Sequence, residues 1–284
     1  MSGASVEVVL HADGARFAAH AQEFYARDPE RHTLALTVLD GVVRHGDPAS
    51  ALATVHAAGA VVGALLCSPR RPPIVSGVAP DQAGAVVDAL ADGGFRAIGA
   101  RGPTAEAQAY AAAHVARHGG NVTVGRATRL FALGTLVPPV GVPGRARPAD
   151  VADAELMHGW RHGFEAEAEP PGHVVHTVET VARDIARSDG GVLLWTVDDQ
   201  PVAWATARVP VGGMSRIGPV YTAPEHRGRG YGAAVTAAAA RWALDHGADR
   251  VLLFTDLANP VSNRLYPRIG FAPVYDGLDL DFND

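Results

Sequence analysis

The sequence predicts a mixed α/β fold, a largely antiparallel sheet flanked by helices, arranged as two domains. A seam at 137–148 (VPPVGVPGRARP) contains four prolines and two glycines, which continue neither as helix nor as a central strand. It divides the 284 residues into 1–140 and 141–284, both of ordinary domain size. In each half, short apolar strands alternate with amphipathic helices. The halves share one order of elements, which suggests an internal duplication.

The second half is predicted as two helices, an antiparallel meander and a β-α-β unit. Asp150 starts a helix that runs to Phe164 and carries Leu156 and Trp160 at helical spacing. The next helix spans 177–187. Turns at 198–199 and 212–213 join the first three strands. The expected strands are 191–197, 201–209, 214–222, 250–255 and 272–276, and the later helices are 231–246 and 262–269.

The first half repeats this outline with weaker patterns. Its expected helices are 15–26, 32–44, 81–90 and 104–117. Its expected strands are 53–55, 60–66, 74–78, 95–99 and 123–133. Identity between the halves is slight, so the duplication rests on the order of the elements.

Composition excludes several chemistries. All 24 basic residues are arginine. Pyridoxal enzymes, P-loop nucleotide hydrolases and protein kinases each require a lysine, so none of these classes fits. The net charge of −6, all of it in the second half, gives no electrostatic case for nucleic acid. Cys67 is the only cysteine, so no intrachain disulfide forms, and we expect it to be a buried core residue.

Targeting patterns are absent from the sequence. The first ten residues include Glu7 and no basic residue, unlike a secretory signal. No uncharged apolar stretch reaches the roughly 18 residues of a transmembrane helix. We therefore expect a cytoplasmic protein without a membrane partner.

The clearest chemical motif lies at 217–232 (IGPVYTAPEHRGRGYG). A strand ends there, and Gly228, Gly230 and Gly232 lead directly into a helix. Glycines let successive backbone N–H groups face one anion, and the helix N-terminus adds its positive dipole end. Arg227 and Arg229 add charge, so this loop is suited to a polyphosphate. The alternatives are a flexible surface turn and a dinucleotide loop. The second is disfavoured because the preceding strand ends an antiparallel meander.

The motif RGRGYG at 227–232 resembles the R-x-x-G-x-G/A motif of the GNAT acyltransferases. The similarity continues through His246-Gly247, the strand at 251–255, and Asn259 seven residues before Tyr266. It is clear over 192–274 and looser over the rest of the second half. The resemblance implies two tandem GNAT-like domains, with 141–284 as the catalytic one and acetyl-CoA as co-substrate without a metal.

The resemblance also assigns the CoA site. It implies that backbone groups of the last strand residues pair with the pantetheine arm, and that the N–H of Val220 or Tyr221 polarises the thioester. Asn259 would hydrogen-bond the arm, or it simply begins a helix. The implied CoA-binding residues are Pro219, Val220, Tyr221, Arg227, Gly228, Arg229, Gly230, Tyr231, Gly232 and Asn259.

Tyr266 is the candidate general acid by its family position. A phenol of pKa about 10 can protonate the leaving thiolate, whose acid has a pKa of about 8.5. Alternatively, Tyr266 packs in the core beside Phe271. The general base is not evident, because the strand at 202–209 lacks the glutamate that many family members carry. Glu165 and Glu167 lie where the acceptor is expected. They would hold an ammonium group or take its proton through water, or they form a solvated acidic face.

No metal site is expected. His158, His162, His173 and His176 cluster in sequence, but the HExxH glutamate is missing and no cysteine is near. The first half is expected to have no acyl-CoA site, because 78–84 has one glycine, no arginine, and Asp81, which would repel phosphate. Three roles stay open for this half: completing a shared sheet, shaping the acceptor cleft, or forming a homodimer.

The sequence therefore predicts an acetyl-CoA-dependent N-acetyltransferase. The acceptor would be an amine of a small molecule or of a peptide N-terminus, attacked directly without an acyl-enzyme. The alternative is a non-catalytic acyl-CoA-binding sensor, which would keep the loop but not Tyr266. The presence of both Tyr266 and Asn259 favours the enzyme.

Overall fold

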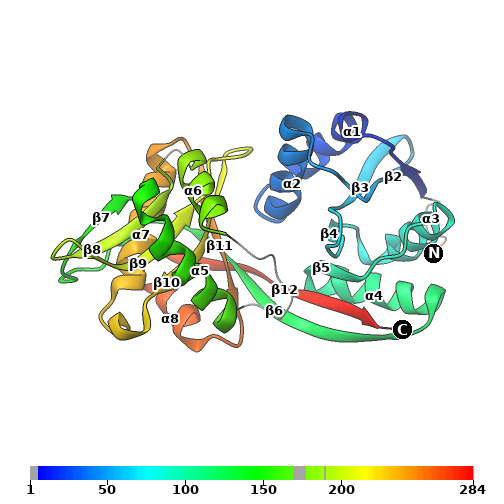
Figure 1. Ribbon diagram of the computed structural model, residues 1–284. Coiled ribbons are helices and arrows are strands. Elements are labelled where there is room, and N and C mark those ends of the chain that lie inside the picture. The colour runs from blue at the N-terminus through cyan, green and yellow to red at the C-terminus, as the bar shows by residue number, and fades with distance from the viewer. Residues whose placement is uncertain (1–5, 169–176, 189, 284) are drawn as a thin grey trace. The chain divides into compact units, whose positions relative to one another are not determined.

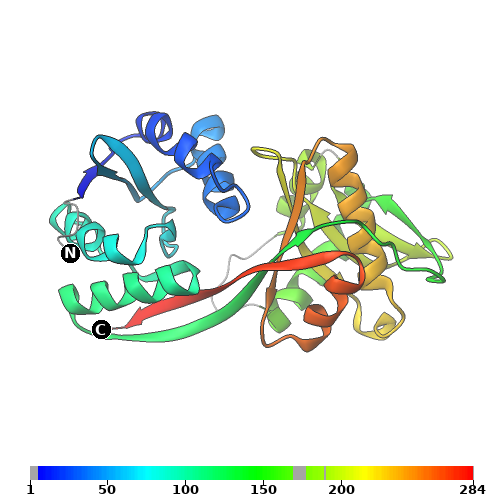
Figure 2. The same cartoon turned by 180° about the vertical axis from the view of Figure 1, so that it is seen from behind.

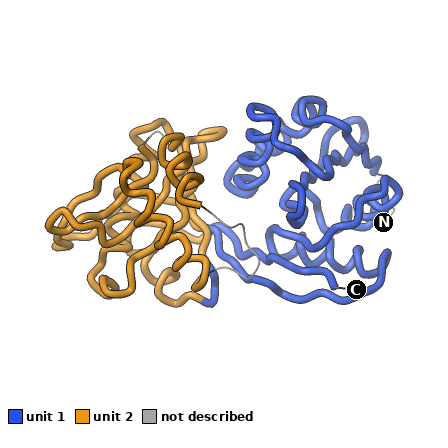
Figure 3. Tube along the Cα trace, in the orientation of Figure 1, with its two compact units in different colours: residues 1–130, 256–258, 274–284 blue, residues 131–255, 259–273 orange. Residues whose placement is uncertain are grey.

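The computed structural model describes residues 6–168, 177–188 and 190–283. They form two compact units (Figure 3), of which unit 1 comprises 1–130, 256–258 and 274–284 and unit 2 comprises 131–255 and 259–273. The units are therefore not two uninterrupted halves. The chain leaves unit 1 near residue 130, before the expected boundary at 140, and its last segment returns to unit 1.

Unit 2 contains the predicted meander and β-α-β unit. Its strands follow the order β11-β10-β9-β8-β7, antiparallel except for the parallel pair β10 and β11. The strand bounds are β7 Arg145–Pro148, β8 Val192–Val197, β9 Gln200–Ala207, β10 Met214–Thr222 and β11 Arg250–Asp256. β7 was not predicted. It lies at an edge of this order, where the prolines of the seam are tolerated.

Helices cover both faces of this sheet (Figure 1). Helices α5 and α6 share an apolar cluster with Leu194, Trp204 and Tyr221. Helices α7 and α8 pack on the other face, where the alanines of α7 allow close contact with β9. The bounds are α5 Ala154–Ala168, α6 Val178–Arg187, α7 Tyr231–Asp245 and α8 Pro260–Arg268.

Unit 1 has the same order of elements. Its strands run β1-β2-β3-β4-β5-β12, with β4 and β5 parallel and the other neighbours antiparallel. The strand bounds are β1 Glu7–Leu10, β2 Ala51–Ala57, β3 Ala60–Cys67, β4 Ile74–Gly77 and β5 Gly99–Pro103. The helices are α1 Gly14–Ala26, α2 Thr33–His45, α3 Ala83–Asp92 and α4 Thr104–His118. The shared order and matching strand directions favour the predicted duplication.

The clearest departures from the sequence prediction concern three strands of unit 1. β1 was not predicted, and β5 begins where the expected strand at 95–99 ends. The last strand, β12 Phe271–Asn283, is much longer than the predicted 272–276. Its second part pairs with β5 from Gly277 to Asp281. A bidentate ion pair between Arg101 and Asp279 joins the two strands. Pairing between residues so distant in sequence leaves no local pattern to detect.

Two long strands, β6 Asn121–Leu133 and β12, pass from one unit to the other, and they run together in Figure 2. β6 follows the last helix of unit 1 but stands next to β11 in the strand order, whereas β12 follows the last helix of unit 2 and stands next to β5. The two strands have therefore exchanged places relative to two separate copies of the fold.

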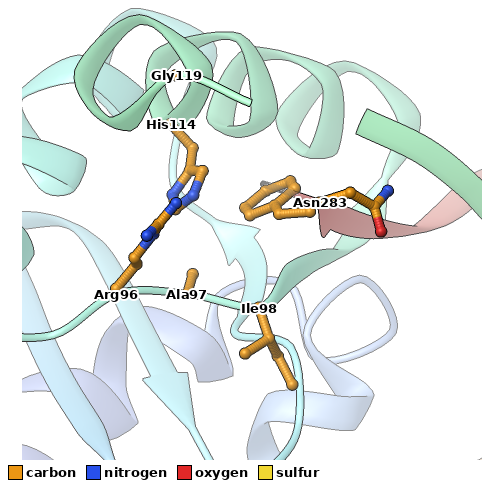
Figure 4. Close-up of a pocket in the computed structure, with 7 residues that line it drawn as sticks. Arg96, Ala97, Ile98, His114, Gly119 and Asn283 are labelled. Carbon is orange, nitrogen blue, oxygen red and sulfur yellow. The ribbon is translucent and has the colours of Figure 1, made fainter. Parts of the chain in front are cut away.

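Phe282 anchors the end of β12 in unit 1. Its ring stacks on buried His114 of α4 with 4.1 Å between centroids. These two side chains and Arg96 help line a cavity of about 200 Å³ (Figure 4). Burial lowers the pKa of His114 to about 4, and the neighbouring His118 and Arg96 act in the same direction.

Two further findings bear on the sequence predictions. Cys67 is buried in unit 1 as expected, and burial raises the pKa of its thiol to about 11. Such a thiol stays protonated and is a poor nucleophile. Within the described residues, no helix combines the length and apolar character that crossing a bilayer requires.

A buried histidine makes unit 1 sensitive to acid. His32 is 5% exposed and its Nδ1 lies 3.0 Å from Ser76 Oγ. Burial lowers its pKa from 6.5 to about 4. His32 and His114 therefore bind protons between pH 4 and 6.5 mainly in the unfolded chain. Stability rises with pH through this window, by at most about 1.4 kcal/mol per pH unit for each group.

We expect the free energy of unfolding to fall when the pH is lowered from 6.5 to 4.5. His32→Gln should reduce this fall, because one of the two protons taken up on unfolding is lost. Denaturant titrations at both pH values measure the effect, with exposed His162→Gln as the control. Equal pH dependence in the wild type and His32→Gln would show that His32 is not the source.

Candidate functional site

Two neighbouring strands of unit 2 part where the predicted site lies. β10 and β11 pair from Met214 and Arg250 as far as Ile217 and Leu253. β10 nevertheless continues to Thr222 and stays paired with β9 on its other side. Beyond Ile217, therefore, one edge of β10 is not covered by β11.

The register identifies which backbone groups face that edge. The Ala223 N–H donates to the Val202 carbonyl across the β9–β10 pair. Because residues of an antiparallel strand point alternately toward and away from their partner, Val220 and Thr222 direct their N–H and C=O groups away from β9. The backbone N–H and C=O groups of Tyr221 point toward β9 and pair with that strand. Of the two predicted N–H donors, the geometry therefore favours Val220.

The glycine-rich loop connects this edge to α7. Gly228 and Gly230 have φ of 78° and 85°, which glycine adopts without strain. Gly230 is the N-cap of α7, and no side chain caps that end. The first-turn N–H groups of a helix have no partner within the helix, so this end suits an anion. Tyr231 points into the core at 4% exposure and contributes to the loop only through its backbone.

Close packing fixes this loop from two sides. A Cβ built on Gly232 would lie 3.3 Å from Thr222 Oγ1, and one on Gly230 would lie 3.0 Å from Val142 Cγ2. Val142 comes from the proline-rich seam, which was predicted only as the boundary between the two domains. Beside the loop, the buried Nδ1 of His226 has no hydrogen-bond partner within the described structure.

The Arg227 side chain is held by contacts with neighbouring residues. Its Nε donates to the Thr222 carbonyl at 3.0 Å, and one terminal nitrogen lies 2.7 and 2.8 Å from the two carboxylate oxygens of Glu167. Its guanidinium also lies 5.6 Å from the centre of the Tyr221 ring. The hydrogen bond to Glu167 is the main reason that the pKa of Arg227 is raised. Arg229, two residues on, is exposed.

The two predicted acceptor residues therefore differ in position. Glu167 is brought to the glycine-rich loop by α5, where it contacts Arg227. Glu165 is half-buried on the same helix. Gly163, which the sequence analysis did not select, allows the Tyr221 hydroxyl to lie against α5, because a Cβ there would come 2.6 Å from it. Nothing in the sequence around Gly163 indicates this contact, because the residue lies inside a helix.

Asn259 acts as the N-cap of α8. Its side-chain oxygen accepts from the N–H groups of Val261 and Ser262 at 3.1 Å. The structure therefore shows Asn259 at the start of a helix, the second of the two interpretations. Its side-chain oxygen is engaged by these two bonds, so only the amide nitrogen is left for another partner.

Tyr266 lies in the core of unit 2 at 6% exposure. Its ring centroid is 6.0 Å from that of Phe271 and 6.2 Å from that of Phe131. Burial raises the pKa of its phenol to about 12, although a hydrogen bond with the Ser262 side chain acts in the opposite direction. Tyr266 is therefore neutral at physiological pH and able to donate a proton, but as a weaker acid than a free phenol.

Two of the four histidines considered as metal ligands, His173 and His176, lie outside the described residues. His158 and His162 lie on α5. Among the residues that the structure describes, no group of three histidine, cysteine or acidic side chains is placed to hold a metal ion.

Unit 1 lacks a counterpart of the loop. Its short 3₁₀ turn Pro80–Gln82 runs directly into α3, whereas residues 227–230 separate the corresponding turn from α7 in unit 2. β5 also stays close to β4. A Cβ built on Gly102 of β5 would lie only 3.2 Å from the Ser76 nitrogen of β4. The described part of this unit therefore has no loop that corresponds to residues 227–230.

Comparison with known proteins finds a family similarity over the part of the chain that contains the loop. Residues 157–271 match the model of the acetyltransferase (GNAT) family. Over 140 residues the chain is 30% identical to a mycothiol acetyltransferase of Stackebrandtia nassauensis, covering 48% of this chain and 46% of that protein. The chain therefore spans about half the length of this curated relative.

Solved structures share the fold across both units. A GNAT-family acetyltransferase from Colwellia psychrerythraea gives a TM-score of 0.61 at 11% identity, covering 98% of this chain and all of that one. A GCN5-related N-acetyltransferase from Sphaerobacter thermophilus gives 0.60 at 18% identity, covering 98% of this chain and 95% of that one. Identities this low establish the fold alone.

We expect Gly163→Ala to disturb the site and Gly159→Ala not to. Both glycines lie on α5, but a Cβ at Gly159 meets open space, whereas one at Gly163 must displace the Tyr221 phenol or the helix. Overpacking of this kind costs about 1–3 kcal/mol, whereas alanine at an open helical position stabilises by up to about 1 kcal/mol. Denaturant unfolding of the two variants measures the difference. Equal stabilities would contradict the close contact.

Proposed function

Because residues 157–271 match the model of the acetyltransferase (GNAT) family, we propose that the chain is an acetyl-CoA-dependent N-acetyltransferase. It transfers the acetyl group directly to an amine of a small molecule or a peptide N-terminus. The observation that carries this proposal is the uncovered edge of β10 at Val220, which leads into a helix N-terminus without a side-chain cap.

The proposed binding site is mostly backbone. The N–H groups of the loop and of the first turn of α7 hold the pyrophosphate, and the positive end of the helix dipole adds to them. Arg229 supplies a flexible cation beside them. The edge of β10 takes the pantetheine arm as an added strand, in the manner of β-augmentation. Asn259 contributes through its amide nitrogen.

For the transfer, the Val220 N–H is the proposed oxyanion donor. It is fixed by the β9–β10 ladder, so it needs no reorganisation when negative charge develops on the thioester oxygen. The amine attacks the carbonyl carbon, the carbon–sulfur bond breaks, the thiolate leaves with the electron pair, and the attacking nitrogen loses its extra proton to solvent water. No enzyme nucleophile is needed, in agreement with the buried, protonated thiol of Cys67.

Tyr266 is the proposed donor of the proton that the thiolate takes. Its burial keeps the phenol neutral and therefore able to donate. The same burial favours a second candidate function, an acyl-CoA sensor without turnover in which Tyr266 is only a core residue. We assign no residue as the base.

The proposal is tested by incubating the protein with acetyl-CoA and a panel of amines, including small polyamines and short peptides with free N-termini. Release of free thiol together with an acetylated amine supports the enzyme. Tight CoA binding with no product from any amine supports the sensor, and absence of CoA binding contradicts both functions.

We expect Tyr266→Phe to lower kcat about 100-fold or more while the Kd for CoA stays the same, because only the proton donor is removed. Tyr110→Phe, at a buried tyrosine of unit 1, is the control for loss of a core hydroxyl. Steady-state thiol release and calorimetric CoA binding measure the two quantities. Unchanged kcat would remove Tyr266 from the mechanism.

We also propose that only the domain expected at 141–284 binds acyl-CoA, because unit 1 has no glycine loop before α3. Isothermal titration of the whole chain with CoA should therefore give one site per chain. The Arg229→Gln variant should bind more weakly by a few-fold, since it loses one charge near the phosphates. A stoichiometry of two CoA molecules per chain would contradict the proposal that unit 1 does not bind acyl-CoA.

A further inference from the structure

The Arg227–Glu167 ion pair lies at the edge of the proposed phosphate site. Arg227 immediately precedes Gly228, and its guanidinium is held by the Thr222 carbonyl, the Tyr221 ring and the Glu167 carboxylate. These partners engage the Nε–H and one of the two terminal nitrogens, which would otherwise be available to an incoming anion.

Glu167 is therefore an anion already bound at a site that favours anions. Its carboxylate reaches the loop from the end of α5, with both oxygens within 2.8 Å of one Arg227 nitrogen. A carboxylate here also repels a polyphosphate bound to the neighbouring N–H groups. Both effects act against a negatively charged ligand.

The pair is nevertheless exchangeable. The side chains of Arg227 and Glu167 are 45% and 49% exposed. Ion pairs this accessible contribute little net free energy, because water and salt screen them. The pyrophosphate of CoA carries one negative charge on each of its phosphates, so as a whole it is more charged than one carboxylate and can replace Glu167 on Arg227 without breaking the fold around it.

We propose that Glu167 is an internal competitor for Arg227: it occupies the guanidinium in the free protein and is displaced by the pyrophosphate of CoA. This inference rests on the proposed function, because it takes the loop as the CoA site. It replaces the two roles considered for Glu167, holding or deprotonating the acceptor amine, with an effect on CoA affinity.

The expected result is opposite to that of losing a binding residue. Glu167→Gln should lower the Kd for CoA about five-fold, because the carboxamide competes weakly for Arg227 and carries no charge. The matched control is Glu155→Gln, which removes the same charge from an exposed position in the first turn of the same helix. Its Kd should stay near that of the wild type. Pantetheine, which has no phosphate, should bind Glu167→Gln and the wild type equally.

A double-variant cycle separates competition from simple repulsion. In an Arg227→Gln background, Glu167→Gln should produce a clearly smaller gain in affinity, because only the repulsion is left to remove and there is no guanidinium to release. Calorimetry at low ionic strength measures all four proteins, and their thermal unfolding confirms that each is folded.

The outcomes are distinct. Tighter CoA binding by Glu167→Gln that depends on Arg227 supports the proposal. An equal gain in both backgrounds shows repulsion only and overturns it, as does unchanged or weaker binding when the wild type binds CoA. If neither the wild type nor Glu167→Gln binds CoA, both this inference and the proposed function fail.

Discussion

The parting of β10 from β11 after Ile217 and Leu253 is the constraint on which the rest of the site depends. A strand inside a sheet has both sets of backbone groups paired, so it has nothing to offer a ligand. Here β10 stays paired with β9 but not with β11. The backbone of Val220 is therefore held in place by β9, while its N–H and C=O groups are not paired with β11. The adjoining loop then brings the first turn of α7 to the same edge. Recognition by fixed backbone groups needs few particular side chains, so the proposed polyphosphate site does not require a lysine.

Much of unit 2 follows from local patterns. The strand Met214–Thr222 was predicted with its observed bounds, and α7 and β11 were predicted to within one residue at each end. Glycine spacing, apolar runs and turn residues act over a few neighbours, so the sequence displays them directly. The loop glycines were identified for the same reason, because only a few residue types accept positive φ.

The remainder depends on contacts between distant segments. Nothing near Arg227 in the sequence indicates that its partner is Glu167, 60 residues earlier. Nothing in the seam indicates that Val142 lies against Gly230. Tyr266 shows the limit most clearly, since a residue chosen for its spacing from Asn259 lies among aromatic rings, where its acidity is weakened. Local spacing identifies a chemical group, whereas packing sets its pKa and partners.

The last strand has a consequence for how the chain acquires its structure. Arg101 and Asp279, which join β5 to β12, are separated by 178 positions. During synthesis from the N-terminus, the residues that finish the sheet of unit 1 are therefore made only after all the residues of unit 2. Until then β5 lacks its β12 neighbour and presents an unpaired edge, the kind of surface on which chains associate wrongly. Contacts of such long range also slow folding. The unit whose elements come first in the sequence is thus completed last, and its maturation is tied to that of the domain carrying the glycine loop.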